Sequence, residues 1–375
     1  MTASLGARAA VVRKEGASFH LESIALDDPR PDELVVRIVA SGICHTDLST
    51  RDGLLPFGFP AVLGHEGSGV VEAVGSGVTG LEPGDHVVLS GAFCGTCPTC
   101  LDGRVVYCPS FPKLSRAGRR PDGSATMFDA QGEPLYGIFV GQSSFSTHVI
   151  VRAVNVVKVP ETLPLELLGP LGCGVMTGAG AVQDTLRPEP GSTVAVFGLG
   201  GVGMSAVAAA RIAGCGKVIA VDVNPARREL ALEIGATDVV DAANDDVVQE
   251  IRRRTGQGVD YSIEASGVAA VGRIAVESTQ GQGTTLLLGA PAFGSDFSVP
   301  WFSILSGRTV RGAIMGGSDP RIFIPRVSAM IGEGIFPLEK LVKYFDFDEI
   351  DAAVDALERG EVVKPIIRMP AQAHS

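Results

Sequence analysis

The chain has 375 residues, of which 45% are hydrophobic and 19% charged, and it contains 48 glycines and seven cysteines. This length and composition are typical of a globular α/β enzyme with two domains and exclude a disordered or fibrous protein. The formal net charge of −11 opposes binding to nucleic acid or to an anionic membrane surface, so neither is expected as a partner.

The N-terminal stretch MTASLGARAAVVRKEGASF is interrupted by Arg8, Arg13 and Lys14, so it lacks the continuous apolar run of a secretory signal. We therefore expect a cytoplasmic protein. A nearly apolar run of about bilayer length occurs later, at residues 194–213. Its valine-rich start, its glycines and Arg211 favour a buried strand, a turn and a helix over a membrane span.

Three short motifs contain residues that can bind a metal. SGICHTD contains Cys44, GHEGSGVV contains His65 and Glu66, and LGCG contains Cys173. Two thiolates and one imidazole with an open fourth position are a ligand set of catalytic zinc, which can hold an alcohol oxygen and lower its pKa. Spacing alone cannot pair ligands so far apart, and a lone buried cysteine is usually a small hydrophobic residue. Both interpretations stay open on this evidence.

Four cysteines gather in the single stretch CGTCPTCLDGRVVYC. Gaps of two residues let successive thiolates turn toward one cation, and a site filled by four thiolates stabilises a fold rather than performing chemistry. A redox disulfide and free thiols are the alternatives, and a nucleic-acid-binding zinc ribbon is disfavoured by the acidic charge. The predicted structural zinc ligands are Cys94, Cys97, Cys100 and Cys108.

The stretch STVAVFGLGGVGMSAVAAARIAG predicts a strand, a phosphate-binding turn and a helix. Gly198, Gly200 and Gly203 have the G-x-G-x-x-G spacing, in which a pyrophosphate approaches the backbone at the start of the helix. A second apolar strand, KVIAV, ends in Asp222. A carboxylate at that position accepts the ribose hydroxyls and repels a 2′-phosphate, so we expect NAD rather than NADP, although Arg227 follows closely.

Beyond this turn, apolar patterns alternate between the helical and the strand period. The segments PARRELALEIGA and DDVVQEIRRRTG are predicted helices, and ATDVVDA, VDYSIEASG and TTLLLGA are predicted strands. Such alternation predicts a doubly wound parallel sheet over about residues 175–313. The acidic run at residues 345–361 also has the apolar spacing of a helix with one solvated face.

In chain order, SGICHTD, GHEGSGVVEAVGSGV, the cysteine loop, LGCG and VFGLGGVG resemble the zinc-containing alcohol dehydrogenases of the medium-chain dehydrogenase/reductase superfamily. The resemblance covers essentially the whole chain. It implies an α/β fold with a GroES-like, β-rich catalytic domain (1–174 and 314–375) and a Rossmann NAD-binding domain (175–313), with the active site in the cleft between them. It also implies two zinc ions per chain, the catalytic one held by Cys44, His65 and Cys173.

The same resemblance implies further roles around the catalytic zinc. Asp47 orients the ring of His65, Glu66 approaches the metal during ligand exchange, and Thr46 takes the alcohol proton. Ser49 stands where many members carry a histidine that completes the proton route. A serine can pass a proton through water but cannot act as a base near neutral pH. The implied NAD-binding residues are His45, Gly198, Gly200, Gly201, Val202, Gly203, Asp222, Arg227 and Lys364.

The long segment after the fourth loop cysteine, with RAGRRPDGSATMF and GIFVGQSSFSTHVIV, resembles aryl-alcohol (benzyl-alcohol) dehydrogenases more than ethanol enzymes. Phe139 and Val140 stand where family members line the alcohol pocket. The expected reaction is the reversible oxidation of a primary aromatic or allylic alcohol to its aldehyde, with hydride transfer to NAD. The family also implies a homodimer or homotetramer.

Besides the nucleic-acid zinc module, which the acidic charge disfavours, two alternative functions stay open. One is a dehydrogenase of secondary alcohols, polyols or thiol-formaldehyde adducts, because apolar pockets discriminate by only modest free energies. The other is a zinc-dependent binding or regulatory protein that has kept the fold and lost the chemistry. Intact Cys44, His65, Cys173 and Thr46 argue against the second alternative.

Overall fold

A computed structural model describes residues 5–292 and 294–371, and the chain divides into two compact units. Unit 1 comprises Met1–Cys173, Asp319–Gly332 and Val342–Ser375, and unit 2 comprises Gly174–Ser318 and Glu333–Leu341. The chain therefore leaves unit 1 after Cys173 and later returns to it. The domain limits expected from the sequence, at residues 174 and 314, remain predictions.

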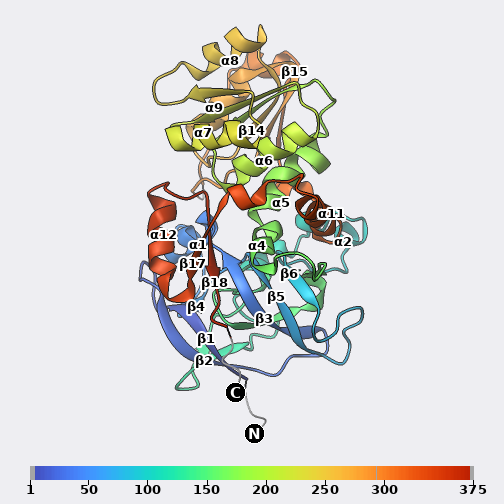
Figure 1. Ribbon diagram of the computed structural model, residues 1–375, viewed down its shortest axis with the longest axis vertical. Helices are drawn as coiled ribbons and strands as arrows, with labels where there is room; N and C mark the ends of the chain where they lie inside the picture. The colour runs from blue at the N-terminus through green and yellow to red at the C-terminus, as the bar shows by residue number, and fades with distance from the viewer. Residues whose placement is uncertain (1–4, 293, 372–375) are drawn as a thin grey trace. The chain divides into compact units, whose positions relative to one another are not determined.

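Unit 1 is built mainly from β-strands. They are β1 (Leu5–Val12), β2 (His20–Leu26), β3 (Glu33–Gly42), β4 (Ala61–Val62), β5 (Gly67–Val74), β6 (His86–Leu89), β7 (Met127–Asp129), β8 (Pro134–Leu135), β9 (His148–Arg152), β10 (Val156–Lys158), β17 (Val342–Asp346) and β18 (Lys364–Arg368). One sheet has the order β4-β1-β2-β7-β8, and the other has the order β10-β6-β5-β3-β18-β17 with β9 also paired to β3. Figure 1 shows β18, in red, beside β3, in blue.

Helices in unit 1 are few and mostly short. They are α1 (His45–Arg51), α2 (Pro98–Leu101), α3 (Phe111–Arg116), α4 (Leu165–Leu168), α11 (Pro320–Gly332) and α12 (Ile350–Glu358). The apolar positions of α12 are buried, as the sequence spacing predicts. The helix is shorter than the acidic run, however, because residues 345–346 belong to β17 and a 3₁₀ turn follows. The apolar side chains of both sheets and of α12 form one core.

Unit 2 contains a six-stranded parallel sheet. Its strands are β11 (Thr193–Phe197), β12 (Lys217–Asp222), β13 (Asp238–Asp241), β14 (Val259–Glu264), β15 (Thr279–Leu287) and β16 (Thr309–Gly312), and its helices are α5 (Gly174–Gly180), α6 (Gly201–Ile212), α7 (Pro225–Ile234), α8 (Val247–Thr255), α9 (Ala269–Ser278) and α10 (Trp301–Leu305). The strand order is β13-β12-β11-β14-β15-β16. The order reverses between β11 and β14, as in doubly wound folds that bind a ligand at this point. The prediction of a β-rich domain joined to a doubly wound parallel sheet is confirmed.

The predicted helices and strands of unit 2 form where the sequence periodicity places them, and side chains fix two helix starts. Asn224 accepts hydrogen bonds from the backbone at the start of α7, and Asp246 does the same for α8. The apolar run at residues 194–213 divides into β11 and α6. Within the residues that the structure describes, no single helix is long and apolar enough to span a bilayer.

Candidate metal centres and active site

Cys44, His65 and Cys173 lie together in unit 1, although they come from three separate segments. One donor atom of each lies within 4.8 Å of those of the other two. Cys44 immediately precedes α1, His65 lies between β4 and β5, and Cys173 is the last residue of unit 1 before the chain enters unit 2. The set has the two thiolates and one imidazole of a catalytic zinc site, in which water or substrate is the fourth ligand.

Asp47, which is fully buried, ties two of these ligand segments together. Its Oδ1 lies 2.8 Å from Nδ1 of His65 and accepts a hydrogen bond from the Gly64 amide at 3.1 Å. Its Oδ2 accepts a hydrogen bond from the Cys44 amide at 2.9 Å. Asp47 therefore occupies Nδ1 of the ring and leaves Nε2 to bind a metal, the usual arrangement of a carboxylate behind a histidine ligand.

The surroundings of the two thiols favour ionisation of Cys44. A hydrogen bond with Cys173 lowers the pKa of the Cys44 thiol well below its ordinary value, and the charges of Lys364 and His65 act in the same direction. The same hydrogen bond, together with burial, raises the pKa of Cys173. Metal binding would displace the proton of the less acidic thiol. The donor set therefore fits zinc.

Glu66 is fully buried beside this set and is held by Lys364, which is also buried. The ammonium group of Lys364 lies 2.9 Å from the Glu66 carboxylate and donates a hydrogen bond to the carbonyl oxygen of Ile43 at 3.1 Å. Burial raises the pKa of Glu66, and the charge of Lys364 opposes this rise. The sequence motifs do not indicate this ion pair, and the contact of Lys364 with NAD remains a prediction.

The predicted proton route lies along α1. Thr46 is half-buried, and its Oγ1 lies 3.8 Å from Sγ of Cys44. Ser49 follows three residues later, so the two hydroxyl-bearing residues share one face of the helix. His45, at the first position of the helix, is exposed. The geometry therefore places a hydroxyl near the metal ligands and a second one farther along α1.

The four cysteines of the loop at residues 94–108 also converge. Their sulfur atoms all lie within 4.8 Å of one another, with separations of 3.5 Å for Cys94 and Cys108, 3.8 Å for Cys94 and Cys100, and 3.9 Å for Cys97 and Cys108. Sulfur atoms bound about 2.3 Å from one tetrahedral zinc lie about 3.8 Å apart. All seven cysteines of the described chain are free of disulfides. The cluster therefore fits a four-thiolate zinc site rather than a disulfide pair.

Backbone amides favour the ionised form of one of these thiols. The amides of Thr96 and Cys97 donate hydrogen bonds to the Cys94 sulfur and lower its pKa to about 6. Burial raises the pKa of Cys100 to about 12. One thiol is thus ionised near neutral pH, and a cation is needed to ionise the buried one.

Replacing Cys97 by serine is expected to reduce the zinc content from two ions per chain to one and to destabilise the loop. We expect the free energy of unfolding to fall by at least about 2 kcal/mol, because loss of a structural metal is among the most costly changes. Metal analysis and thermal unfolding of the purified variant test this. A variant that keeps two zinc ions would contradict the assignment, and Cys215→Ser, at a buried cysteine outside both clusters, is the control.

The glycine motif forms a tight turn between β11 and α6. Gly198 has a φ of 84°, which favours glycine, and a Cβ on Gly203 would collide with the Gly198 carbonyl oxygen. Gly203 therefore lets α6 start close against the turn. The intervening residues Gly201 and Val202 form the first turn of α6, whose amides can face a phosphate.

Asp222 lies at the end of β12, directly beside this turn. Its carboxylate accepts hydrogen bonds from the amides of Leu199 at 2.6 Å and Asn224 at 2.8 Å. A mostly apolar pocket of about 240 Å³ adjoins it. The sequence did not single out the apolar residues of this pocket, which were recognisable only as strand ends and helix starts. The pocket is lined by Phe197, Gly198, Val221, Asp222, Val223, Ala242, Val247, Ser266, Val268, Val271 and Ile274.

Aromatic rings lie next to the metal ligand in unit 1. Phe139 packs its ring edge-on against that of His65, with the centroids 5.5 Å apart, and against Phe57 at 5.2 Å. Val140 follows in the left-handed region, with a φ of 48°.

Arg227, the residue predicted beside the ribose, lies half-buried in the first turn of α7.

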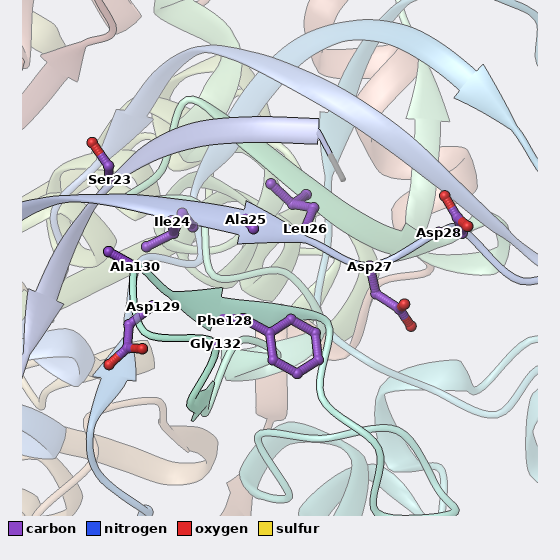
Figure 2. A pocket seen from close by; sticks show the side chains of 10 residues that line it. All are labelled: Ser23, Ile24, Ala25, Leu26, Asp27, Asp28, Phe128, Asp129, Ala130 and Gly132. Carbon is purple, nitrogen blue, oxygen red and sulfur yellow. The ribbon is translucent and has the colours of Figure 1, made fainter. Parts of the chain in front are cut away.

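A separate hollow of about 500 Å³ lies over β2 and β7 (Figure 2). Its walls contain none of the predicted site residues. Two of its carboxylates are already engaged, because Asp129 pairs with Arg13 and Asp27 pairs with Arg120. These ion pairs leave Asp27 and Asp129 neutralised by arginines, and neither metal-ligand cluster lies in this hollow.

Comparisons with known proteins agree with these sites. Residues 30–161 match the family model described as an alcohol dehydrogenase GroES-like domain, and residues 201–329 match that of a zinc-binding dehydrogenase. A geraniol dehydrogenase of Castellaniella defragrans is 43% identical over 97% of this chain and 98% of its own length.

Two solved structures are also similar along nearly their whole length. An alcohol dehydrogenase zinc-binding domain protein from Burkholderia ambifaria is 47% identical, with a TM-score of 0.97, over 98% of this chain and 100% of its own. The benzyl alcohol dehydrogenase of Acinetobacter calcoaceticus is 39% identical, with a TM-score of 0.94, over the same shares of the two chains.

Proposed function

Since the chain belongs to the zinc-binding alcohol dehydrogenase family, we propose that this zinc-dependent alcohol dehydrogenase reversibly oxidises a primary aromatic or allylic alcohol to the aldehyde, with NAD as the hydride acceptor. The observation that carries the proposal is the aromatic wall at the metal ligand, where Phe139 packs edge-on against His65 and Phe57 packs against Phe139. Flat, apolar substrates fit such a wall. Two similar proteins carry the names of a geraniol and a benzyl alcohol dehydrogenase.

Residues of unit 1 have separate roles in the proposed reaction. Zinc bound by Cys44, His65 and Cys173 would supply the Lewis acidity that lowers the pKa of an alcohol, and NAD would accept the hydride. Asp47 holds the His65 ring in its binding orientation. Thr46 accepts the alcohol proton, and Ser49, one turn farther along α1, passes it to water.

Two further roles follow from charge. Lys364 holds the buried carboxylate of Glu66 beside the ligand set, so that Glu66 approaches the metal only when a ligand leaves. In unit 2, the carboxylate of Asp222 accepts the ribose hydroxyls and repels a 2′-phosphate, which favours NAD over NADP. Arg227 follows in the first turn of α7 and contacts the adenosine side of NAD.

The first test compares alcohols by the initial rate of NADH formation. We expect kcat/KM for benzyl alcohol and geraniol to exceed that for ethanol at least about tenfold, which is about 1.4 kcal/mol of transition-state discrimination. Replacing NAD by NADP is expected to lower kcat/KM by a similar or larger factor. A kcat/KM for ethanol comparable to that for benzyl alcohol and geraniol would exclude a pocket selective for aromatic or allylic alcohols. Turnover only with secondary alcohols, polyols or thiol-formaldehyde adducts would favour that alternative.

We also propose that the enzyme is a homo-oligomer and that β16 is an interface. β16 is the edge strand of the parallel sheet and all four of its residues are exposed. The adjacent α10 exposes Trp301 by 78% and Phe302 by 81%. Such an edge with apolar neighbours is stabilised by pairing with a second copy about a two-fold axis.

Sedimentation velocity is expected to give a dimer or a tetramer. Trp301 is the sole tryptophan of the sequence, so its fluorescence should shift to longer wavelength as dilution separates the copies. A monomer at all concentrations, with tryptophan emission typical of full exposure, would contradict this proposal.

The thiolate-rich clusters also support a reducing compartment, and we propose that the enzyme is cytoplasmic.

A further inference from the structure

The segment from Phe139 to Phe145 forms an unusual turn that the proposed reaction leaves unexplained. Val140 and Ser143 both lie in the left-handed region, with φ of 48° and 63°. Residues without glycine's freedom adopt this conformation only where the surroundings hold them in it. The hydroxyl group of Ser143 does so, because it accepts a hydrogen bond from the Phe139 amide at 2.8 Å and donates one to the Val62 carbonyl at 2.6 Å.

After this turn, the chain runs alongside the segment that leads to the metal ligand. The amide of Phe145 donates a hydrogen bond to the Leu63 carbonyl at 3.0 Å, and the amide of Ser144 donates one to the Gly64 carbonyl at 2.9 Å. Gly64 has a φ of 90°, and a Cβ there would lie 2.5 Å from the Phe145 nitrogen. The two segments are therefore paired by their backbones up to the residue before His65.

The side chain of Gln142 continues this pairing past the point where the backbones separate. Its Nε2 donates a hydrogen bond to the His65 carbonyl at 2.9 Å, and its Oε1 accepts one from the Gly67 amide at 3.0 Å. Gln142 is fully buried. It therefore satisfies two backbone groups on either side of Glu66, in a place where unpaired polar groups are costly.

Gln142 also reaches the aromatic wall. Its own amide donates a hydrogen bond to the Phe139 carbonyl at 3.0 Å, and the ring of Phe139 packs against that of His65. Gln142 is thus connected to the metal-ligand segment through its side-chain amide and to Phe139 through its backbone amide. We propose that Gln142 is a positioning residue that fixes His65 and Glu66 relative to Phe139. Its effect on alcohol turnover rests on the proposed function, whereas its effect on the metal does not.

The variant that tests this is Gln142→Met, which keeps the length of the side chain and removes both amide hydrogen bonds. The readout is the rate at which zinc-loaded protein loses metal to a chromophoric chelator, without NAD or alcohol. Release should occur in two phases, one for each site, and Cys44→Ser assigns them because it disrupts only the three-ligand site. We expect the phase of that site to become about tenfold faster or more, with the four-cysteine phase unchanged.

Ser146→Ala is the matched control. The Ser146 hydroxyl is buried in the same segment and bonds the backbone of Arg8 and His148, away from the metal ligands. Its variant should release both metals at the wild-type rates. If Gln142→Met does not fold, Gln142→Asn is used, because it keeps the amide but withdraws it by one carbon. An unchanged catalytic-site phase in a folded Gln142 variant, or equal acceleration in Ser146→Ala, would overturn the proposal.

Turnover separates this inference from the proposed function. With benzyl alcohol and NAD, Gln142→Met should lower kcat about tenfold or more while KM for NAD changes less than about twofold. If the wild-type protein oxidises no alcohol, the proposed function fails and the metal-release experiment still decides the role of Gln142. A normal kcat in a variant with accelerated metal loss would limit Gln142 to holding the metal and overturn its link to Phe139.

Discussion

Replacing Cys44 by serine is expected to lower kcat/KM at least about a thousandfold, a loss of about 4 kcal/mol of transition-state stabilisation. The environment of Cys44 lowers the pKa of its thiol, which therefore binds metal as a thiolate. A serine hydroxyl keeps its proton near neutral pH and leaves only His65 and Cys173 to hold the ion. Binding of NAD should be retained, because the glycine turn and Asp222 belong to unit 2, which does not contain Cys44.

The measurements for Cys44→Ser are metal content, NADH formation and NAD binding by calorimetry. Zinc should fall from two ions per chain to one, and the dissociation constant of NAD should stay within about threefold of wild type, less than about 0.7 kcal/mol. Cys215→Ser makes the same chemical change at a buried cysteine outside both clusters and should leave all three values unchanged. Full turnover in Cys44→Ser, or loss of NAD binding together with turnover, would refute the assigned role.

Replacing Asp47 by alanine is expected to weaken both the fold of unit 1 and the metal site. The carboxylate accepts hydrogen bonds from the Cys44 and Gly64 amides and contacts the His65 ring, all within a fully buried site. Its loss leaves these groups without their acceptor, and we expect the free energy of unfolding to fall by about 3 kcal/mol or more. Zinc affinity should fall about 10- to 100-fold, because the ring of His65 is no longer held in its binding orientation.

Asp52→Ala is the matched control for this change. Asp52 follows the last residue of the same helix, and its carboxylate pairs with Arg51. We expect this variant to unfold within about 0.5 kcal/mol of wild type and to bind zinc normally. Chemical denaturation and competition with a metal indicator measure both effects. Equal stability losses in the two variants would show that Asp47 contributes no more than an ion pair at the end of a helix.

Sites formed by residues close in sequence could be predicted from the sequence alone, without the resemblance to a known family. The four loop cysteines lie within fifteen residues, so their spacing alone predicts that the sulfur atoms converge. The glycine turn and Asp222 lie on consecutive elements of a β-α-β unit, whose geometry is fixed by strand and helix periods. In both cases the local sequence determines the local structure, and the structure places the side chains together.

The catalytic ligands could not be paired in this way. Cys44, His65 and Cys173 meet only when β3, β5 and the chain segment before unit 2 have packed together, and no periodicity encodes that packing. The resemblance to known dehydrogenases supplied the pairing. The ion pair of Glu66 with Lys364 and the hydrogen bonds of Gln142 were missed for the same physical reason, because each joins segments that are distant in sequence.

The pairing of β18 with β3 sets an order of events during biosynthesis. Ile366 of β18 pairs with Gly42 of β3, and Lys364 supplies the cation against buried Glu66. The ribosome makes these residues after every strand of unit 2 has been synthesised. Unit 2 can therefore fold while the sheet that contains β3 still lacks β18 and β17, and contacts between such distant residues form slowly. Until Lys364 is made, buried Glu66 lacks its counter-ion, although the ligands Cys44, His65 and Cys173 are already in the chain.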